Sequence, residues 1–256
     1  GNPNVGKSTL MNALVGEKLS IITSKAQTTR HRIMGIVSGE DFQIVYSDTP
    51  GILKPSYKLQ ESMMKFVTGA VTDADVILYV TDTVEQGDRS AEIIGRIRES
   101  GIPTVVVINK IDLSTPEALD ALVDKWRQEL PEAQIVPASA KENFNIEGLF
   151  KTILALLPEG PAFYPKETLT DKTLRFFASE IIREKILKFY DKEIPYCCEI
   201  EIDSYREEPT IDRIAATIYV ARDSQKGILI GHKGEKLKRV GQTAREDMEE
   251  FLGKKV

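Results

Sequence analysis

The amino-acid sequence predicts a mostly parallel, doubly wound α/β domain followed by a smaller α+β domain. Short apolar runs alternate with helical patterns through residues 1–157, as they do where helices cover both faces of a parallel sheet. Residues 158–170 contain three prolines and one glycine, which is typical of a linker. In residues 171–256 the order changes to a helix, two strand-like segments and a second helix. We therefore expect two domains joined by this linker.

The first domain owes its predicted sheet to four apolar runs, at residues 42–47, 76–81, 104–109 and 133–139. The middle two are apolar almost throughout, which indicates strands buried on both faces. Helical patterns cover residues 92–100 and 116–130, and Thr115 is placed to cap the second of them. Residues 33–47 predict a hairpin with its turn at residues 39–41, which adds one antiparallel strand.

The composition, with 41% hydrophobic and 29% charged residues, is that of a globular protein. No run approaches the ~20 apolar residues of a membrane-spanning helix. Cys197 and Cys198 are adjacent, so we expect free thiols and a cytoplasmic protein. The net charge of −5 argues against a generally basic nucleic-acid binder. Residues 222–239 nevertheless hold six basic residues against two acidic ones, which makes them a candidate anion-binding surface.

Residues 1–9, GNPNVGKST, match the phosphate-loop pattern G-x-x-x-x-G-K-[S/T] at every fixed position: Gly1, Gly6, Lys7 and Ser8. The glycines let successive N–H groups turn towards phosphates, and the following helix adds the positive end of its dipole. We expect Lys7 to reach the β- and γ-phosphates and Ser8 to coordinate Mg²⁺. No strand precedes the loop, which we attribute to chain missing before Gly1.

Three further motifs close predicted strands: DTPG at residues 48–51, NKID at 109–112 and SAK at 139–141. Ligands of α/β sheets bind at the carboxyl ends of the strands, so we expect the three motifs to surround one nucleotide. Asp48 is placed to hold Mg²⁺, and Gly51 to offer its backbone N–H to the γ-phosphate.

The NKID motif predicts that the base is guanine. The Asp112 carboxylate can accept hydrogen bonds from the ring N–H and the exocyclic amine of guanine, whereas adenine has no donor at either position. Asn109 and Lys110 would brace the loop and cover the base, and the Ala140 N–H would bond the guanine carbonyl. The predicted nucleotide-binding residues are Asn2, Pro3, Asn4, Val5, Gly6, Lys7, Ser8, Thr9, Asp48, Gly51, Asn109, Lys110, Asp112, Ser139, Ala140 and Lys141.

In these motifs and their order, the chain resembles the translation-factor-like GTPases and, within them, the Era family; the resemblance covers essentially the whole chain. Residues 25–32, KAQTTRHR, look like the first switch of that family. The resemblance implies that Thr29, or failing that Thr28, closes on Mg²⁺ and the γ-phosphate when GTP is bound. The implied Mg²⁺ ligands are then Ser8, Thr29 and Asp48.

The predicted reaction is hydrolysis of GTP to GDP and phosphate, with Lys7, Thr29, Gly51 and Asn4 as the catalytic group. Ras-type enzymes place a Gln after the D-x-x-G glycine to orient the attacking water. Here that residue is Ile52, which cannot make the hydrogen bond, so we expect slow intrinsic hydrolysis. Related GTPases with Asn at the position of Asn4 can hold K⁺, which suggests K⁺ as a second cation in this active site.

Residues 226–241 contain the G-x-x-G turn Gly231-His232-Lys233-Gly234 between an apolar segment and a basic helix. With the preceding helix–strand–strand order, this turn resembles that of a type II KH domain, whose loop clamps about four single-stranded nucleotides. Residues 171–256 would then form a KH-type domain that is incomplete at its C-terminus, because its third strand follows the last helix. The predicted RNA-binding residues are Lys226, Gly231, His232, Lys233, Gly234, Lys236 and Arg239.

A GTPase followed by a KH domain is the signature of the Era family. The resemblance implies a GTP-hydrolysing switch that binds the 3′ end of small-subunit ribosomal RNA and acts in assembly of the small ribosomal subunit. The expected partners are GTP or GDP, that RNA and the subunit itself. We expect a monomer, and peripheral contact with the inner face of the cell membrane stays an open expectation.

Two alternatives stay open at this point. A signalling or membrane-associated GTPase would use its second domain to bind protein, and residues 226–239 are the feature that distinguishes it. A P-loop ATPase or kinase is opposed by the NKID and SAK motifs.

Overall fold

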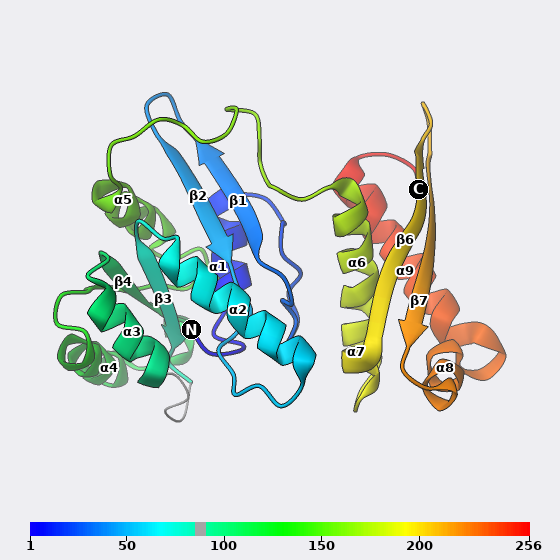
Figure 1. Cartoon of the computed structure of the whole chain (residues 1–256), viewed down its shortest axis with the longest axis horizontal. Helices are drawn as coiled ribbons and strands as arrows, with labels where there is room; N and C mark the ends of the chain where they lie inside the picture. The colour runs from blue at the N-terminus through cyan, green and yellow to red at the C-terminus, as the bar shows by residue number, and fades with distance from the viewer. Residues whose placement is uncertain (85–90) are drawn as a thin grey trace. The chain divides into compact units, whose positions relative to one another are not determined.

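The structure, a computed structural model, describes residues 1–84 and 91–256 and divides them into two compact units (Figure 1). The first unit comprises residues 1–20 and 29–171, and the second comprises residues 21–28 and 172–256. The predicted domains were residues 1–157 and 171–256. In the structure, residues 158–171 belong to the first unit, and residues 21–28 from the N-terminal half belong to the second.

The strands of the first unit form two separate ladders. The predicted hairpin is present, with antiparallel pairing of β1 (Ile33–Ser38) and β2 (Gln43–Asp48). The second ladder is parallel, in the order β3-β4-β5, and its strands span Ile77–Asp82, Thr104–Asn109 and Gln134–Pro137. Val105 to Ile108 of β4 are fully buried, as their unbroken apolar run predicts for a central strand.

A cavity of about 460 Å³ separates the two ladders. It is lined by β2, by β3 and by residues of α1 (Lys7–Val15), and Gly1 lies on its wall. The Tyr46 hydroxyl is buried in this wall, and the described residues offer it no hydrogen-bond partner. Burial raises the pKa of Tyr46 well above its usual range.

Helices cover the strands of the first unit, and α2 crosses in front of them in Figure 1. The helices span Lys7–Val15 (α1), Lys58–Thr72 (α2), Ala91–Ser100 (α3), Pro116–Glu129 (α4) and Ile146–Leu156 (α5), with a short 3₁₀ turn at Ile111–Leu113. The Thr115 hydroxyl accepts from the Ala118 N–H at 3.3 Å, which is the predicted cap of α4. The rings of Tyr79 and Trp126 contact each other in a tilted arrangement, 5.1 Å between centroids, and hold α4 on β3.

The segment predicted as a linker, residues 158–170, lies along the β1–β2 hairpin. The Leu169 carbonyl accepts from the Ile36 N–H at 2.8 Å, and Thr170 forms a bridge with Gly35. The Gln43 side chain donates to the Tyr164 carbonyl at 2.8 Å. Through these hydrogen bonds the segment is part of the first unit.

The second unit packs helices α6 and α9 together, and α6 against strand β6. Ile186 of α6, Leu229 of α8 and Val240 of α9 meet in its core. Lys255 pairs in parallel with Ile211, just before β7. Its elements are α6 (Leu174–Phe189), α7 (Ile194–Cys197), β6 (Cys198–Glu207), β7 (Asp212–Val220), α8 (Asp223–Ile230), a 3₁₀ turn at His232–Gly234 and α9 (Glu235–Leu252).

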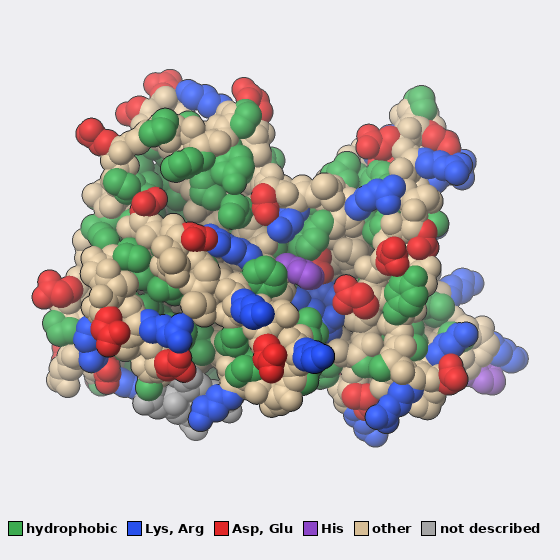
Figure 2. Space-filling view, in the orientation of Figure 1, with side chains coloured by type: hydrophobic (Ala, Val, Ile, Leu, Met, Phe, Trp, Pro, Cys, Tyr) green, Lys and Arg blue, Asp and Glu red, His purple; other side chains and the backbone are tan. Residues whose placement is uncertain are grey.

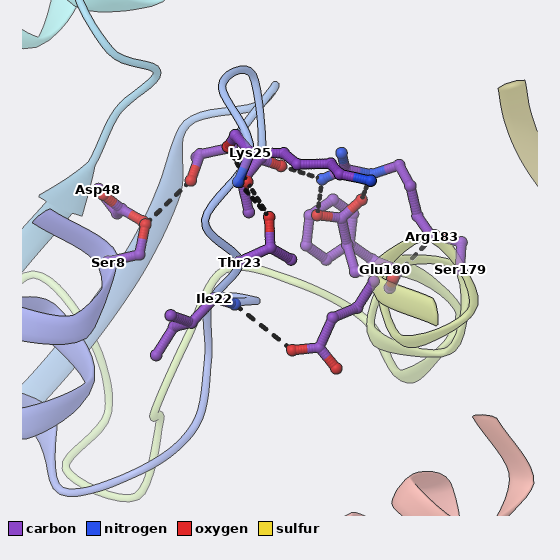
Figure 3. A network of polar contacts seen from close by, with 12 residues as sticks. Ser8, Ile22, Thr23, Lys25, Asp48, Ser179, Glu180 and Arg183 are labelled. Atoms are coloured by element: carbon purple, nitrogen blue, oxygen red, sulfur yellow. Dashed lines mark hydrogen bonds and ion pairs between the residues drawn. The ribbon is translucent and has the colours of Figure 1, made fainter. Parts of the chain in front are cut away.

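Helix α6 buries charged side chains as well as apolar ones, and Figure 3 shows Glu180 and Arg183 of this helix. Arg183 donates to both carboxylate oxygens of Glu180, at 2.7 and 2.6 Å, and to the Thr28 carbonyl. Glu184 accepts from the Ile22 N–H at 3.5 Å. Because buried charges need partners, residues 21–28 are part of the second unit through these contacts.

Among the helices of the described ranges, none is both long enough and apolar enough to span a bilayer.

Candidate nucleotide and RNA sites

The phosphate loop depends on backbone conformations that its sequence permits. Gly6 has φ of 92°, and Asn4 also lies in the left-handed region at 64°. A Cβ on Gly6 would meet the Asn109 Nδ2 atom at 2.2 Å. Only glycine therefore fits at this position, where both the conformation and the space exclude a side chain.

Lys7 opens α1, and its ammonium donates to the Asn2 carbonyl at 2.7 Å. The side chain is thereby held across the loop rather than in solvent. This places a positive charge next to the backbone amides that precede the helix, which is the arrangement that binds a phosphate chain.

The three predicted Mg²⁺ ligands come together at the start of α1. The Ser8 hydroxyl donates to Asp48 Oδ2 at 2.7 Å and lies 2.9 Å from the Thr29 hydroxyl. Figure 3 shows Ser8 and Asp48 facing one another. By contrast, the Thr28 hydroxyl bonds to Thr23 and to the Lys25 carbonyl, so Thr29 is the better placed of the two threonines.

Asp48 is 3% exposed, and burial raises the pKa of its carboxyl, although the Ser8 hydrogen bond and the Lys7 charge partly offset this. Its Oδ1 atom has no hydrogen-bond partner among the described residues. The described residues contain no group of three His, Cys, Asp or Glu side chains that could hold a metal. Mg²⁺ in a GTPase takes one or two protein oxygens with phosphate oxygens and water, so one buried carboxylate and two hydroxyls fit this cation.

Gly51 and Ile52 differ sharply in what they present to the phosphate loop. A Cβ on Gly51 would meet the Pro3 backbone at 2.7 Å, so Gly51 packs directly on the loop. The Ile52 N–H donates to the Gly1 carbonyl at 3.1 Å, while its side chain is 5% exposed and packs in the core cluster with Val67. Ile52 therefore points its side chain away from solvent and offers nothing that orients a water molecule.

Asn109 joins the base-binding motif to the other two loops. Its Nδ2 donates to the Val5 carbonyl at 2.9 Å, and its Oδ1 accepts from the Ala140 N–H at 3.0 Å. The Asp112 carboxylate is exposed and is oriented by the Ser139 hydroxyl at 2.6 Å. Motifs separated by about a hundred residues along the chain are thus fixed to one another at a single edge of the sheet.

Two of the predicted residues have partners within the protein. The Ala140 N–H is donated to Asn109, so a bond from it to a guanine carbonyl requires the same hydrogen to be shared. The Lys141 side chain is exposed and pairs with Glu142 at 3.2 Å, which leaves only its backbone near the site. Neither arrangement could be predicted, since both depend on which neighbours the folded loop supplies.

Asp82 is a residue at this edge that the sequence analysis did not identify. It ends β3 directly opposite Asn109, is 5% exposed and forms an ion pair with Lys110 at 2.6 Å. An acidic residue at the end of an apolar strand, like Asp48 at the end of β2, was the available signal.

The G-x-x-G loop of the second unit connects α8 to α9. Gly231 has φ of 75° and ψ of −178°, and Gly234 has φ of 78°. Lys233 between them is also left-handed, with φ of 50°. The conformation at Gly231 is open only to glycine, and it lies where the chain leaves α8.

Cationic side chains surround this loop, and Figure 2 shows Lys and Arg side chains at the end of the unit where Figure 1 places α8. Lys226, His232 and Lys233 are exposed. Lys236 lies over the Tyr190 ring at 5.7 Å, and Arg239 over the Phe189 ring at 4.2 Å. The two aromatic rings orient these cations while leaving them exposed, so that they remain accessible to an anion.

The two sites together define a class of protein: a P-loop GTPase followed along the chain by a KH-type RNA-binding domain. Family models agree, since residues 1–110 match a model described as 50S ribosome-binding GTPase and residues 193–256 match the KH domain. The chain is 43% identical to the GTPase Era of Alkaliphilus metalliredigens over 261 residues, covering all of this chain and 88% of that protein. It belongs to the Era family of GTPases.

Other relatives give the same result. The GTPase Era of Staphylococcus haemolyticus is 43% identical, with all of this chain and 86% of that protein covered. A solved structure of Era in complex with MgGDPNP and nucleotides 1506–1542 of 16S ribosomal RNA matches with a TM-score of 0.95 at 40% identity, covering all of this chain and 88% of that one. A single-residue variant of Aquifex aeolicus Era bound to GDP·AlF₄⁻ matches with a TM-score of 0.94 at 39% identity and the same coverage.

Proposed function

We propose that this GTPase is a nucleotide-dependent switch that binds the single-stranded 3′ end of small-subunit ribosomal RNA during assembly of the small ribosomal subunit. The observation that carries the proposal is the glycine loop at residues 231–234, with exposed lysines on both sides, in the same chain as a phosphate loop that Asn109 fixes to the NKID motif. A relative solved with nucleotides of 16S ribosomal RNA supports the choice of RNA.

Four side chains would hold the nucleotide's phosphates and their metal. Lys7 would exchange its bond with the Asn2 carbonyl for the β- and γ-phosphates. Ser8 and Thr29 would coordinate Mg²⁺ directly, and Asp48 would bind it through water, which gives the Asp48 Oδ1 atom a partner. When bound, Mg²⁺ neutralises the phosphate charge. The Gly51 N–H, beside Pro3, would bond the γ-phosphate.

The guanine base would lie between Lys110 and the loop at residues 139–141. Asp112 would accept two hydrogen bonds from it, with one carboxylate oxygen already oriented by Ser139. An adenine ring offers that carboxylate no donor, so we expect GTP to bind more tightly than ATP. Comparable affinities for the two nucleotides in calorimetry would contradict this assignment.

Hydrolysis would be slow without a stimulating partner, because the Ile52 side chain is buried in the core. We also propose that Asn4 helps to bind K⁺ beside the phosphates. The K⁺ ion would supply the positive charge that an arginine finger supplies in other GTPases. Asn4 is exposed and left-handed at the tip of the loop. Turnover should be faster in K⁺ than in Na⁺ buffer, and equal rates in the two buffers would exclude this role.

The RNA proposal is tested by crosslinking the protein to cellular RNA in its GTP-analogue and GDP states and sequencing what is recovered. We expect enrichment of the 3′ end of small-subunit ribosomal RNA in the GTP-analogue state. Anisotropy with a labelled oligonucleotide of that sequence and a scrambled oligonucleotide measures the selectivity.

Gly231→Asp is the loss-of-function control, because it places a side chain and a negative charge where the RNA backbone would approach. Its GDP affinity should equal that of the wild type. If Gly231→Asp left RNA affinity unchanged and no ribosomal RNA were recovered, a protein-binding second domain would become the better proposal.

We further propose that the protein acts as a monomer in the cytoplasm. Light scattering of the purified chain measures its mass in solution. Flotation with vesicles tests the peripheral membrane contact, and recovery of the protein in the vesicle fraction at physiological salt would support it.

A further inference from the structure

Lys110 is held in place by the end of β3, a strand that carries none of the nucleotide motifs. Its ammonium contacts Asp82 Oδ2 at 2.6 Å and donates to the Asn4 carbonyl at 2.6 Å. Its own carbonyl accepts from the Thr83 hydroxyl at 2.9 Å. Lys110 itself is left-handed, with φ of 59°. The side chain therefore spans from β3 to the tip of the phosphate loop in a fixed orientation.

The two oxygens of Asp82 have different tasks. Oδ1 accepts from the Val84 N–H at 3.0 Å and shapes the turn after β3, whereas Oδ2 faces Lys110. Asp82 is 5% exposed and Lys110 30% exposed, so the pair is only partly screened by water. A buried carboxylate that faces one ammonium fixes that ammonium more firmly than an exposed pair does.

We infer that Asp82 is a positioning residue for guanine-nucleotide binding: it anchors the Lys110 ammonium, so that Lys110 clamps the Asn4 carbonyl of the phosphate loop and keeps its alkyl stem in place to cover the base. The inference rests on the proposed place of Lys110 at the base. Without the anchor, the four-carbon stem regains its rotamers, and ordering it again on nucleotide binding costs conformational entropy.

Asp82→Asn tests the inference, because the amide oxygen can still accept from Val84 while the charge that faces Lys110 is lost. We expect the Kd for fluorescent GDP to rise on the order of tenfold, mainly through faster dissociation, with the melting temperature of the nucleotide-free protein little changed. Asp82→Glu, which keeps the charge, should restore most of the affinity. Asp75→Asn removes the same charge just before the opposite end of β3 and should leave the Kd unchanged.

A double-mutant cycle with Lys110→Met separates this role from a structural one. Lys110→Met should weaken GDP binding at least as much as Asp82→Asn, and Asp82→Asn should add nothing to it. If Asp82→Asn multiplied the loss in the Lys110→Met background, or left Kd and dissociation rate unchanged in the wild type, the inference would be overturned. If Lys110→Met alone had no effect, the proposed base site itself would be wrong.

Discussion

The phosphate loop at residues 1–8 and the G-x-x-G loop at residues 231–234 both place left-handed glycines before a helix, but their surroundings differ. A Cβ on Gly6 would strike the buried Asn109 amide, whereas one on Gly234 would meet nothing within 4 Å. The first loop is contacted by side chains from the ends of β2 and β4, which suits one small ligand of fixed shape. The second is open on its outer side, which suits the backbone of a polymer that enters and leaves along its length.

The largest effect is expected from Gly6→Ala. The methyl group would need both a left-handed conformation and the space of the Asn109 Nδ2 atom, which is 2.2 Å away. Strain of ~1–2 kcal/mol and the loss of buried Asn109 hydrogen bonds should together lower GDP affinity by about 100-fold or more. Calorimetric titration with GDP measures it.

Gly16→Ala is the matched control for that variant. Gly16 ends the same helix with φ of 81°, and nothing lies within 4 Å of its Cβ position. It should lose about 1 kcal/mol of folding stability through strain alone and keep its GDP affinity. If Gly16→Ala weakened GDP binding as much as Gly6→Ala, enclosure by Asn109 would not be the cause.

A smaller effect is expected from Gly231→Ala, measured as affinity for the RNA oligonucleotide. Its φ of 75° with ψ of −178° strains any other residue, but the atoms its Cβ would meet belong to the flexible Lys236 side chain. We expect a loss of about tenfold. Gly234→Ala meets no atom and should lose less, since only its conformation is strained. Equal losses at both positions would mean that the contact with Lys236 is immaterial.

The smallest effect is expected from Lys233→Ala, which removes one exposed cation of the open loop. RNA affinity should fall only a few-fold, and the slope of log affinity against log salt should decrease by about 1. Lys125→Ala, an exposed lysine on α4, should leave the slope unchanged. A similar change for both variants would show that the loop attracts RNA through overall charge alone.

The sequence predicted those features of the structure that depend on residues close together in the chain. The strands and the motifs at their ends were predictable, because a buried strand reveals itself by its apolar run and a motif by its spacing. Asp82 was not, since its partner Lys110 is distant in the sequence and only the parallel pairing of β3 and β4 brings them together. Helix α8 could not be predicted either, because it contains Gly227 and its short apolar run is equally typical of a strand.

The charged face of α6 was also beyond local prediction. The spacing of its charged residues suggests a solvated helix face. Each of three of them is nevertheless at most 5% exposed: Glu180, Arg183 and Glu184. They are covered by residues 21–28, and no feature of α6 indicates that a loop from the other end of the chain lies on it.

That loop has a consequence for how such a protein can change over evolution. Residues 21–28 are encoded within the GTPase half but find their partners, Arg183 and Glu184, in the KH half. A chimera that received the KH domain of an unrelated protein would lose the support of the predicted first switch along with the old RNA site. We therefore expect substitutions in residues 21–28 to be accompanied by substitutions at the α6 residues that they contact.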